Sequence, residues 1–244
     1  MVGSTRGGYF RKQPIYRIAR NWPLSFPEQA SIDFIDVTPE GFYYQVLPVL
    51  RFPIEDLGKY VRATSHVWSH SYYIPQSTVK LARKFDAVIY MIRDPRDVVL
   101  SMVDFDFTPF RKRFYGTGKE SKAALKMSYA PLVAEQWPAH VSPYLYHRRK
   151  LNLHLMFYED LVHSLDEEIR RLLKYLGLTI DDAAIEKLKG RVRLSNMRGR
   201  SPGHVSKGII GRWRRELPKD LQTMFDQRCG PLLRALDYPS SRWG

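Results

Sequence analysis

The sequence contains a single cysteine, Cys229, in 244 residues. One thiol cannot form an intrachain disulfide, which is typical of proteins in a reducing compartment, so we expect a cytoplasmic location. The sequence also lacks any apolar run approaching the ~20 residues of a membrane-spanning helix. Its first residues, MVGSTRGGYF, lack the apolar core of about 7–15 residues that a secretory signal requires. These absences favour a soluble protein with no membrane partner.

Acidic residues are scarce relative to basic ones. The chain has 39 Lys and Arg against 25 Asp and Glu, which gives a formal net charge of +14. Residues 187–215 contain ten Lys or Arg and no acidic residue. Such a local excess favours an anion bound at a site, although a solvated basic loop remains the alternative. Charge alone would also fit a nucleic acid, but no nucleic-acid recognition pattern accompanies it, so we predict no nucleic-acid partner.

Apolar runs predict strands that alternate with helices. Residues 86–92 (DAVIYMI) and 151–158 (LNLHLMFY) are continuous β-rich runs typical of strands buried on both faces, and residues 59–64 (KYVRAT) alternate like a further strand. Apolar spacing and end signals predict helices at residues 75–85, 95–105, 164–178 and 179–190.

The order of these elements predicts the fold. Strands alternating with helices favour one α/β domain over residues 1–244, with a mostly parallel sheet covered on both faces. The helix 164–178 has Ser164 as its expected N-cap and Gly177 as its stop. Residues 105–120 are aromatic, basic and loop-like, and form either a mobile lid or an ordinary surface loop.

A charged stretch, RDPRD at residues 93–97, joins the strand 86–92 to the helix 95–105. Ligands of open α/β sheets bind at the carboxyl ends of strands, and a helix N-terminus favours an anion. Arg93 supplies a planar cation suited to phosphate, and Ser101 a hydroxyl two turns along. The carboxylates would repel a phosphate unless Asp94 caps the helix and Asp97 pairs with an arginine. A phosphate site and a capped helix start with surface ion pairs are both open at this point.

The stretch VIYMIRDPRDVVLSM (88–102) resembles the 3′-phosphate-binding strand, turn and helix of the sulfotransferases that use 3′-phosphoadenosine 5′-phosphosulfate (PAPS). In that family an arginine at the strand end and a serine eight residues later hold the 3′-phosphate of the donor. The resemblance therefore implies that Arg93 and Ser101 bind this phosphate.

Two further segments follow in the order of the family. Residues 153–178 are similar to its strand, YEDL turn and helix, which implies that Tyr158 lies near the adenine. Residues 206–217 (SKGIIGRWRREL) resemble the segment that closes over the same 3′-phosphate. This implies binding roles for Ser206, Lys207 and Gly208, although the family usually has arginine at the serine position. Nearby upstream arginines, Arg198 or Arg200, could supply the missing charge.

The family begins with a loop that wraps the 5′-phosphosulfate, and TRGGYF (5–10) takes that place. The resemblance implies donor contacts from five residues of this loop, which are Arg6, Gly7, Gly8, Tyr9 and Phe10. Arg6 would also stabilise the leaving oxygen, with Lys12 as a second candidate. Because two hydroxyl side chains of the family loop are absent, backbone N–H groups would have to take their place. The alternative is a chain start in which the glycines are incidental.

A histidine is expected as the catalytic base. An acceptor hydroxyl loses its proton as it attacks sulfur, and an imidazole titrates in the range suited to take it. The resemblance places this base just before the phosphate-binding strand, where His66 is the first choice and His70 the second. A hydrogen-bonded loop histidine is the alternative. No third metal ligand stands at a convincing spacing, and no metal is required if side chains supply the charge.

The resemblance implies a three-layer α/β/α sulfotransferase fold, related to that of P-loop NTPases, although the chain lacks a Gly-x4-Gly-Lys-Ser/Thr sequence. It implies transfer of a sulfuryl group from PAPS to a hydroxyl or amine of a small-molecule acceptor, leaving 3′-phosphoadenosine 5′-phosphate (PAP). A non-catalytic relative that binds a nucleotide or polyanion is the alternative. The resemblance also implies a helix at residues 133–149 near the acceptor, and we expect its Trp137 to pack in the core.

Overall fold

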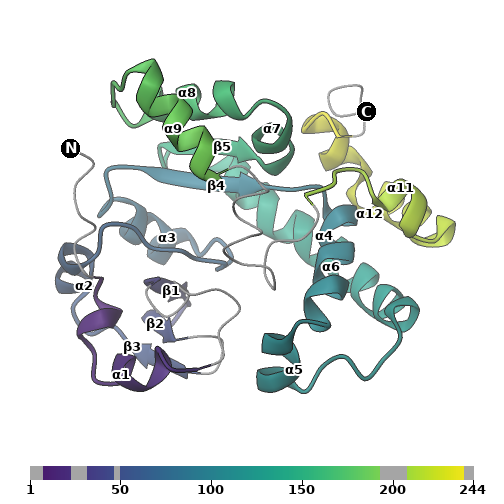
Figure 1. Ribbon diagram of the computed structural model, residues 1–244, viewed down its shortest axis with the longest axis horizontal. Coiled ribbons are helices and arrows are strands. Elements are labelled where there is room, and N and C mark those ends of the chain that lie inside the picture. Colours follow the sequence, from purple (N-terminus) through teal and green to yellow (C-terminus); the bar gives the residue numbers. More distant parts are fainter. Residues whose placement is uncertain (1–7, 23–31, 47–49, 193–207, 239–244) are drawn as a thin grey trace. The chain divides into compact units, whose positions relative to one another are not determined.

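The computed structural model describes residues 8–22, 32–46, 50–192 and 208–238 (Figure 1). The chain divides into two compact units, Met1–Val88 and Ile89–Gly244, which we call unit 1 and unit 2. Each unit has its own cluster of buried apolar side chains, and each is described by itself. The expectation of one domain over residues 1–244 stays a prediction.

Unit 1 is built on a three-stranded antiparallel sheet. Strand β1 (Phe34–Val37) pairs with β2 (Phe42–Val46), and β2 pairs with β3 (Leu50–Pro53). Trp68 forms a parallel bridge with Phe34. This bridge uses the free edge of β1, because β2 already occupies the other edge. The sequence patterns did not predict this sheet.

Short helices complete unit 1. They are η1 (Phe10–Lys12), α1 (Tyr16–Ala19), α2 (Leu57–Ala63) and α3 (Pro75–Ala82). Their apolar side chains meet those of the sheet in one core, which contains Phe10, Ala19, Ile35, Val37, Tyr44, Ile54, Leu57, Tyr60 and Leu81. The helix predicted at residues 75–85 is confirmed as α3, which begins with proline at its first position.

The strand predicted at residues 59–64 is wrong, because these residues belong mostly to α2. Asp56 caps that helix, since its side chain accepts a hydrogen bond from the N–H of Lys59 at 2.9 Å. Leu57 and Tyr60 lie three residues apart and are both buried, which is helical spacing. Seven residues are too few to separate the period of a helix from that of a strand, and the cap at Asp56 favours the helix.

Unit 2 contains the paired strands β4 (Val88–Ile92) and β5 (Leu153–Phe157). The N–H of Asp94, which follows β4, donates to Oε1 of Glu159, which follows β5, at 2.9 Å. The two strands therefore end at the same edge and run parallel, as their side-by-side positions in Figure 1 illustrate. Both predicted strands and the α/β class are confirmed, but the expected burial on both faces is wrong for β4, in which Ile89 and Met91 are exposed.

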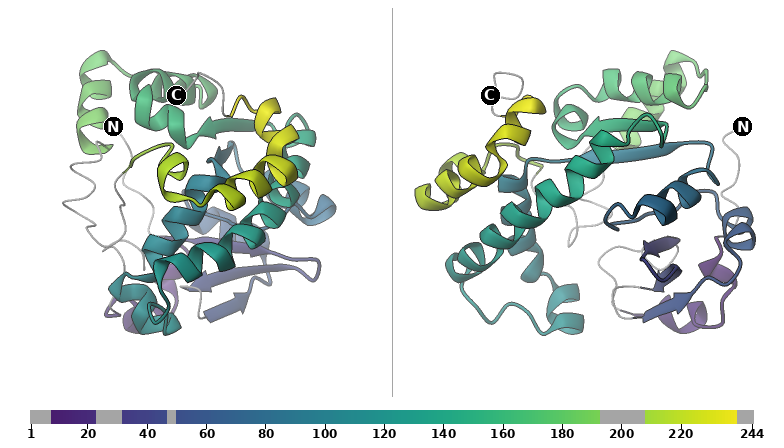
Figure 2. Two further views of the ribbon diagram at one scale, coloured as in Figure 1. Left: turned by 90° about the vertical axis from the view of Figure 1, so that its right-hand side faces the viewer. Right: turned by 180° about the vertical axis from the view of Figure 1, so that it is seen from behind.

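Three helices form the main core of unit 2: α4 (Pro95–Asp106), α6 (Lys122–Tyr146) and α12 (Lys219–Ala235). They lie beside one another in both views of Figure 2. The fully buried contacts include Val99 and Leu100 from α4, Ala134 from α6, and Phe225 and Cys229 from α12. The predicted helices at residues 95–105 and 133–149 are thus confirmed, and the second begins earlier than expected.

Residues 105–120 were expected to form a loop, which is wrong for much of the stretch. They contain the end of α4 and the helix α5 (Pro109–Tyr115). Thr108 caps α5 by accepting from the N–H of Arg111 at 3.4 Å, and Gly116 ends it with φ 65°. The threonine–proline pair was a helix-start signal that aromatic and basic composition obscured.

The remaining helices of unit 2 are α7 (Tyr158–His163), α8 (Leu165–Tyr175), α9 (Asp182–Val192) and α11 (Trp213–Glu216). The predictions of α8 and α9 are confirmed. Ser164 holds the N-cap position of α8 but makes no side-chain capping bond, whereas Gly177 follows its end with φ 63°. Of the helices in the described ranges, none is both long and apolar enough to cross a membrane.

Candidate functional site

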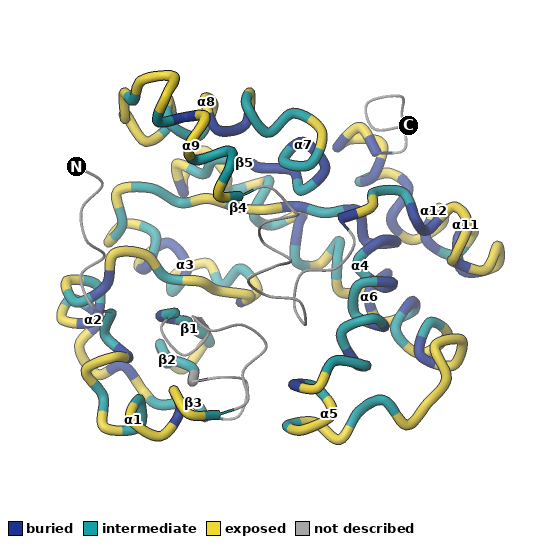
Figure 3. Tube along the Cα trace, in the orientation of Figure 1, coloured by how far each residue is buried: buried dark blue, intermediate teal, exposed yellow. Residues whose placement is uncertain are grey.

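The junction between β4 and α4 buries most of its charge. The first turn of α4 lies in the interior, as Figure 3 shows. Asp94 caps this helix as predicted, because its Oδ1 accepts from the N–H of Arg96 at 2.9 Å. Proline at the first helical position loses no hydrogen bond, since that N–H would lie outside the helical ladder.

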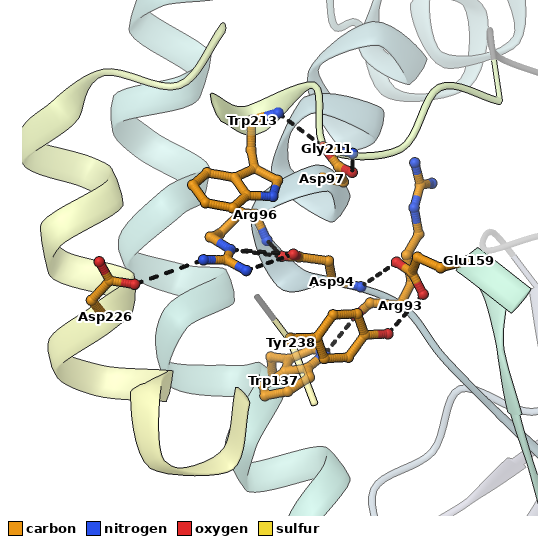
Figure 4. A network of polar contacts seen from close by, with 10 residues as sticks. All are labelled: Arg93, Asp94, Arg96, Asp97, Trp137, Glu159, Gly211, Trp213, Asp226 and Tyr238. Carbon is orange, nitrogen blue, oxygen red and sulfur yellow. Dashed lines mark hydrogen bonds and ion pairs between the residues drawn. The ribbon is translucent and has the colours of Figure 1, made fainter. Parts of the chain in front are cut away.

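Arg96 is fully buried and ion-paired. Its Nε donates to Asp94 Oδ1 at 2.9 Å and its Nη2 donates to Oδ2 at 2.7 Å, which is a two-point pair. The guanidinium also lies 3.6 Å from the centre of the Trp213 ring (Figure 4). Burial with a matched carboxylate and an aromatic face satisfies this cation, so Arg96 is not available to a ligand.

Asp97 is also buried, and it binds backbone rather than an arginine. Its Oδ2 accepts from the N–H of Gly211 at 2.6 Å, and its Oδ1 accepts from the N–H of Trp213 at 3.0 Å. The expected pairing of Asp97 with an arginine is not formed with any described arginine. Burial raises the pKa of Asp97, an effect that the N–H of Gly211 opposes and the charge of Asp94 reinforces.

Arg93 is the charged residue of this junction that the interior does not use. It is half-buried, and its guanidinium lies 4.3 Å from the centre of the Tyr158 ring. Figure 4 shows this side chain directed away from the pair of Asp94 and Arg96. No acidic side chain in the described ranges forms an ion pair with Arg93. The structure therefore brings together two predicted site residues and shows, within the described residues, no counter-ion for this cation.

Two side chains fix the peptide that joins Arg93 to Asp94. Trp137 of α6 donates from Nε1 to the carbonyl oxygen of Arg93 at 3.0 Å. Glu159 accepts from the N–H of Asp94 and, through Oε2, from the hydroxyl of Tyr238 at 2.7 Å. Burial raises the pKa of Glu159, and these two donors oppose the shift. The backbone under Arg93 is thus held from both sides.

The other predicted phosphate ligands are placed in part. Ser101 is half-buried on α4, one helical turn beyond Asp97. Gly208 is buried with φ 62°, a conformation that favours glycine. Ser206 and Lys207 lie outside the described residues, as do Arg198 and Arg200.

The predicted donor loop meets a carboxylate of its own chain. The N–H of Tyr9 donates to Oδ2 of Asp33 at 3.1 Å, and the N–H of Phe10 donates to Oδ1 at 2.8 Å. A Cβ on Gly8 would lie 2.1 Å from Asp33 Oδ2, so glycine is required here. Burial raises the pKa of Asp33, and these N–H groups oppose that shift. Arg6 and Gly7 lie outside the described residues.

Phe10, Lys12, His66 and His70 are the remaining predicted site residues of unit 1. The Phe10 side chain packs in the core, and Lys12 ends the short helix η1. His66 is exposed, and its Nδ1 lies 3.1 Å from Oγ of Ser65. His70 is exposed as well, with its ring packed on Phe34 at 5.2 Å between centroids. Within the described ranges, no three His, Cys, Asp or Glu side chains gather as metal ligands.

Sequence reasoning missed Asp33, Trp137 and Glu159 as parts of the candidate site. Trp137 was expected only to pack in the core, and Glu159 was noted only as part of the YEDL turn. The sequence signal available for Glu159 was an acidic residue directly after a predicted strand, residues 151–158. Asp33 precedes a short strand that was not predicted, so no signal pointed to it.

Comparisons with known proteins identify the family. The family model of the sulfotransferase domain matches residues 61–237. Sulfotransferase 4A1 of Homo sapiens is 26% identical over 189 residues, covering 74% of this chain and 64% of that protein. The amine sulfotransferase of Oryctolagus cuniculus is 20% identical over 201 residues, covering 74% of this chain and 65% of that protein. The chain belongs to the sulfotransferase domain family, which confirms the resemblance found in the sequence.

Solved structures share the fold. The mouse sulfotransferase SULT7A1 complexed with PAP aligns with a TM-score of 0.60 and 16% identity, over 84% of this chain and 76% of that chain. Retinol dehydratase in complex with androsterone and inactive cofactor PAP aligns with a TM-score of 0.54 and 16% identity, over 72% of this chain and 55% of that chain. The chain spans less than two thirds of the length of the curated relatives named above.

Asp33→Ala should destabilise the chain. The substitution removes both acceptors from the N–H groups of Tyr9 and Phe10, and each unsatisfied buried donor costs about 1–3 kcal/mol. Because relief of the buried carboxylate offsets part of this, we expect the free energy of unfolding in urea to fall by about 1–3 kcal/mol. Asp36→Ala, in β1 itself, breaks an ion pair with the exposed Arg51 and a hydrogen bond from the buried Ser71, and should cost no more than about 1 kcal/mol. Equal losses would contradict the role of Asp33.

Glu159→Gln should change how stability depends on pH. Since the folded-state pKa of Glu159 lies above its ordinary value of 4.5, the folded chain binds this proton more tightly than the unfolded chain. Its contribution to stability therefore falls as the pH rises from near 4.5 towards neutrality. Urea unfolding should show the advantage of the native protein over Glu159→Gln shrinking across that window.

Asp166→Asn provides the matched control for this pH series. Arg170 and Lys189 lower the pKa of Asp166 below its ordinary value of 3.8, which is the opposite shift. The contribution of Asp166 is therefore present above that value and is lost on acidification. Slopes of the same sign for both variants would show that burial does not govern Glu159.

Proposed function

We propose that this chain is a sulfotransferase that moves a sulfuryl group from PAPS to a hydroxyl or amine of a small-molecule acceptor. Membership of the sulfotransferase domain family supports the reaction, and the compared solved structures carry PAP. The observation that carries the proposal is Arg93, a half-buried cation at the carboxyl end of β4 that has no acidic partner among the described residues. Such a cation at a strand end is suited to a phosphate.

The 3′-phosphate of the donor would bind to Arg93 and Ser101. Asp94 and Arg96 satisfy each other, and both oxygens of Asp97 are occupied, so these residues leave Arg93 to act on the ligand. Tyr158 already lies against the Arg93 guanidinium, which supports an adenine position next to it. Ser206, Lys207 and Gly208 would close over the same phosphate, as the family resemblance implies.

The 5′ side of the donor would bind to Arg6, Gly7 and Gly8. The N–H groups of Tyr9 and Phe10 were also predicted to contact the donor. They donate to Asp33, so a donor phosphate would reach them only by displacing that carboxylate. We therefore assign the main charge at this end to Arg6, near the oxygen that leaves sulfur.

In the proposed reaction the acceptor oxygen or nitrogen attacks sulfur in line with the bond to the 5′-phosphate. The sulfur–oxygen bond breaks, its electron pair goes to the phosphate oxygen, and PAP leaves with that charge. His66 takes the proton that the acceptor loses, because its imidazole is exposed and suited to general base catalysis. Fixed cations at the leaving oxygen would stabilise the developing charge, as in phosphoryl transfer.

Arg93→Ala should weaken binding of PAP far more than binding of adenosine 5′-phosphate, which lacks the 3′-phosphate. A hydrogen bond between charged groups contributes about 1.5–3 kcal/mol, so PAP affinity should fall roughly 10- to 150-fold. Isothermal titration calorimetry measures both ligands. Arg113→Ala removes an exposed arginine of α5 and should leave both affinities unchanged. Equal losses for the two ligands in Arg93→Ala would exclude Arg93 as the 3′-phosphate ligand.

His66→Ala should lower turnover about 10²- to 10⁴-fold and leave PAP affinity nearly unchanged, because the base acts on the acceptor and not on the nucleotide. A label-transfer assay with radiolabelled PAPS and a panel of alcohols, phenols, amines and sugars measures turnover. If His70→Ala abolishes transfer and His66→Ala does not, His70 is the base. PAP-dependent heat stabilisation without any labelled product would instead favour a non-catalytic nucleotide-binding protein.

A further inference from the structure

Asp97 occupies a particular place among the residues assigned to the 3′-phosphate. It lies four residues after Arg93 and four residues before Ser101. Positions four apart on a helix share a face, so Asp97 and Ser101 lie on one side of α4, and Arg93 directly precedes the N-cap of this helix. A buried carboxylate in that position would repel a phosphate unless its charge is already engaged.

The charge of Asp97 is engaged by the segment at residues 208–213. One carboxylate oxygen accepts from the N–H of Gly211 at 2.6 Å and the other from the N–H of Trp213 at 3.0 Å. Gly211 has φ 71°, a backbone conformation that favours glycine at this bend. Both N–H groups can meet one carboxylate because the backbone turns at Gly211, as Figure 4 shows.

Neighbouring contacts hold the same segment at two more points. The Trp213 ring stacks on Arg96, which immediately precedes Asp97. Further along α4, Asp104 accepts from Nη1 of Arg212 at 2.9 Å. Unlike these two side-chain contacts, Asp97 binds the backbone of the segment directly. Its hydrogen bond from Gly211 is, of these contacts, the one nearest in the chain to Gly208.

We propose that Asp97 is a positioning residue that anchors the segment 208–213 on the start of α4, between Arg93 and Ser101 in the chain, and thereby joins two parts of one 3′-phosphate site. This inference rests on the proposed function. Gly208 lies three residues before Gly211, and three residues of extended chain span at most about 10 Å. The anchor therefore confines Gly208 to the neighbourhood of the start of α4 before any ligand binds.

The same contacts explain how a carboxylate can stand between two phosphate ligands. Two backbone N–H groups point their dipoles at its oxygens, and the charge of Arg93 also acts favourably on it. These contacts offset part of the cost of burying the negative charge. Preorganisation of this kind lowers the entropic cost of ordering a binding segment when the nucleotide arrives.

Asp97→Asn tests the anchor, because asparagine keeps the shape but offers one acceptor oxygen in place of two. We expect amide hydrogen exchange at Gly211 and Trp213 to become about tenfold faster in the intact chain. We also expect PAP affinity to fall about 3- to 30-fold while the affinity for adenosine 5′-phosphate stays within about twofold, since coupling through a positioned segment contributes on this scale.

Two further variants serve as controls. Asp166→Asn removes a surface acidic residue of the same unit and should change neither measurement. Asp104→Asn releases Arg212 but keeps both backbone bonds to Asp97, so exchange at Gly211 should stay slow. Equally fast exchange at Gly211 in Asp104→Asn and Asp97→Asn would overturn the assignment of the anchor to Asp97.

The outcomes separate this inference from the proposed function. If Asp97→Asn speeds exchange at the two amides but leaves the preference for PAP intact, the segment is anchored without completing the site, and the inference is wrong while the proposed function stands. If the native chain itself binds PAP no better than adenosine 5′-phosphate, the 3′-phosphate site and the inference both fail, whatever the exchange rates show.

Discussion

The buried ion pair between Asp94 and Arg96 is the interaction on which the candidate site of unit 2 depends. Removing two charges from water costs several kcal/mol for each ion, and only close geometry with further hydrogen bonds offsets that cost. The pair meets this condition through two direct bonds, the helix cap at the Arg96 N–H and the Trp213 ring. The start of α4, and with it the direction of the residues that follow β4, is set by this requirement.

Burial also sorts residues that look equivalent in the sequence. The stretch at residues 93–97 contains two arginines and two aspartates, and all four have the charge to act on a ligand. Arg96 and Asp94 form an ion pair with each other, and the two oxygens of Asp97 accept hydrogen bonds from two backbone N–H groups. Arg93 remains, held in place through its own backbone by Trp137 and resting on Tyr158. The asymmetry that a phosphate site needs therefore arises from satisfying the interior.

Local signals explain which elements could be predicted. Strands β4 and β5 are continuous apolar runs, and α3, α4 and α8 carry proline starts or a glycine stop, so neighbours in sequence specify them. In α2 the period is ambiguous over seven residues, and the cap at Asp56 overrides it. Helix α5 had its threonine and proline signal, but its composition resembled a loop. The antiparallel sheet of unit 1 depends on pairing between short strands, which the residues of each strand alone do not specify.

The candidate site was predictable only where the family pattern placed residues side by side. The resemblance put Arg93 and Tyr158 near one nucleotide, and the structure places them in contact. The residues that support them are joined over long separations, 44 residues from Arg93 to Trp137 and 65 from Asp94 to Glu159. A single sequence does not reveal such pairs, because the identity of one residue does not indicate which distant residue it contacts.

The two ends of the proposed donor site therefore differ in what binding would require. At the 3′ end the guanidinium of Arg93 lacks an acidic partner among the described residues, so a phosphate there replaces no ion pair within those ranges. At the 5′ end the backbone donors of Tyr9 and Phe10 hold Asp33, because buried N–H groups need an acceptor when no ligand supplies one. Since burial raises the pKa of Asp33, its carboxylate is less stable there than in water, which lowers the cost of displacing it. Under this proposal, Arg93 could bind the 3′-phosphate without breaking an ion pair among the described residues. A donor phosphate could bind the N–H groups of Tyr9 and Phe10 only if the carboxylate of Asp33 moved away.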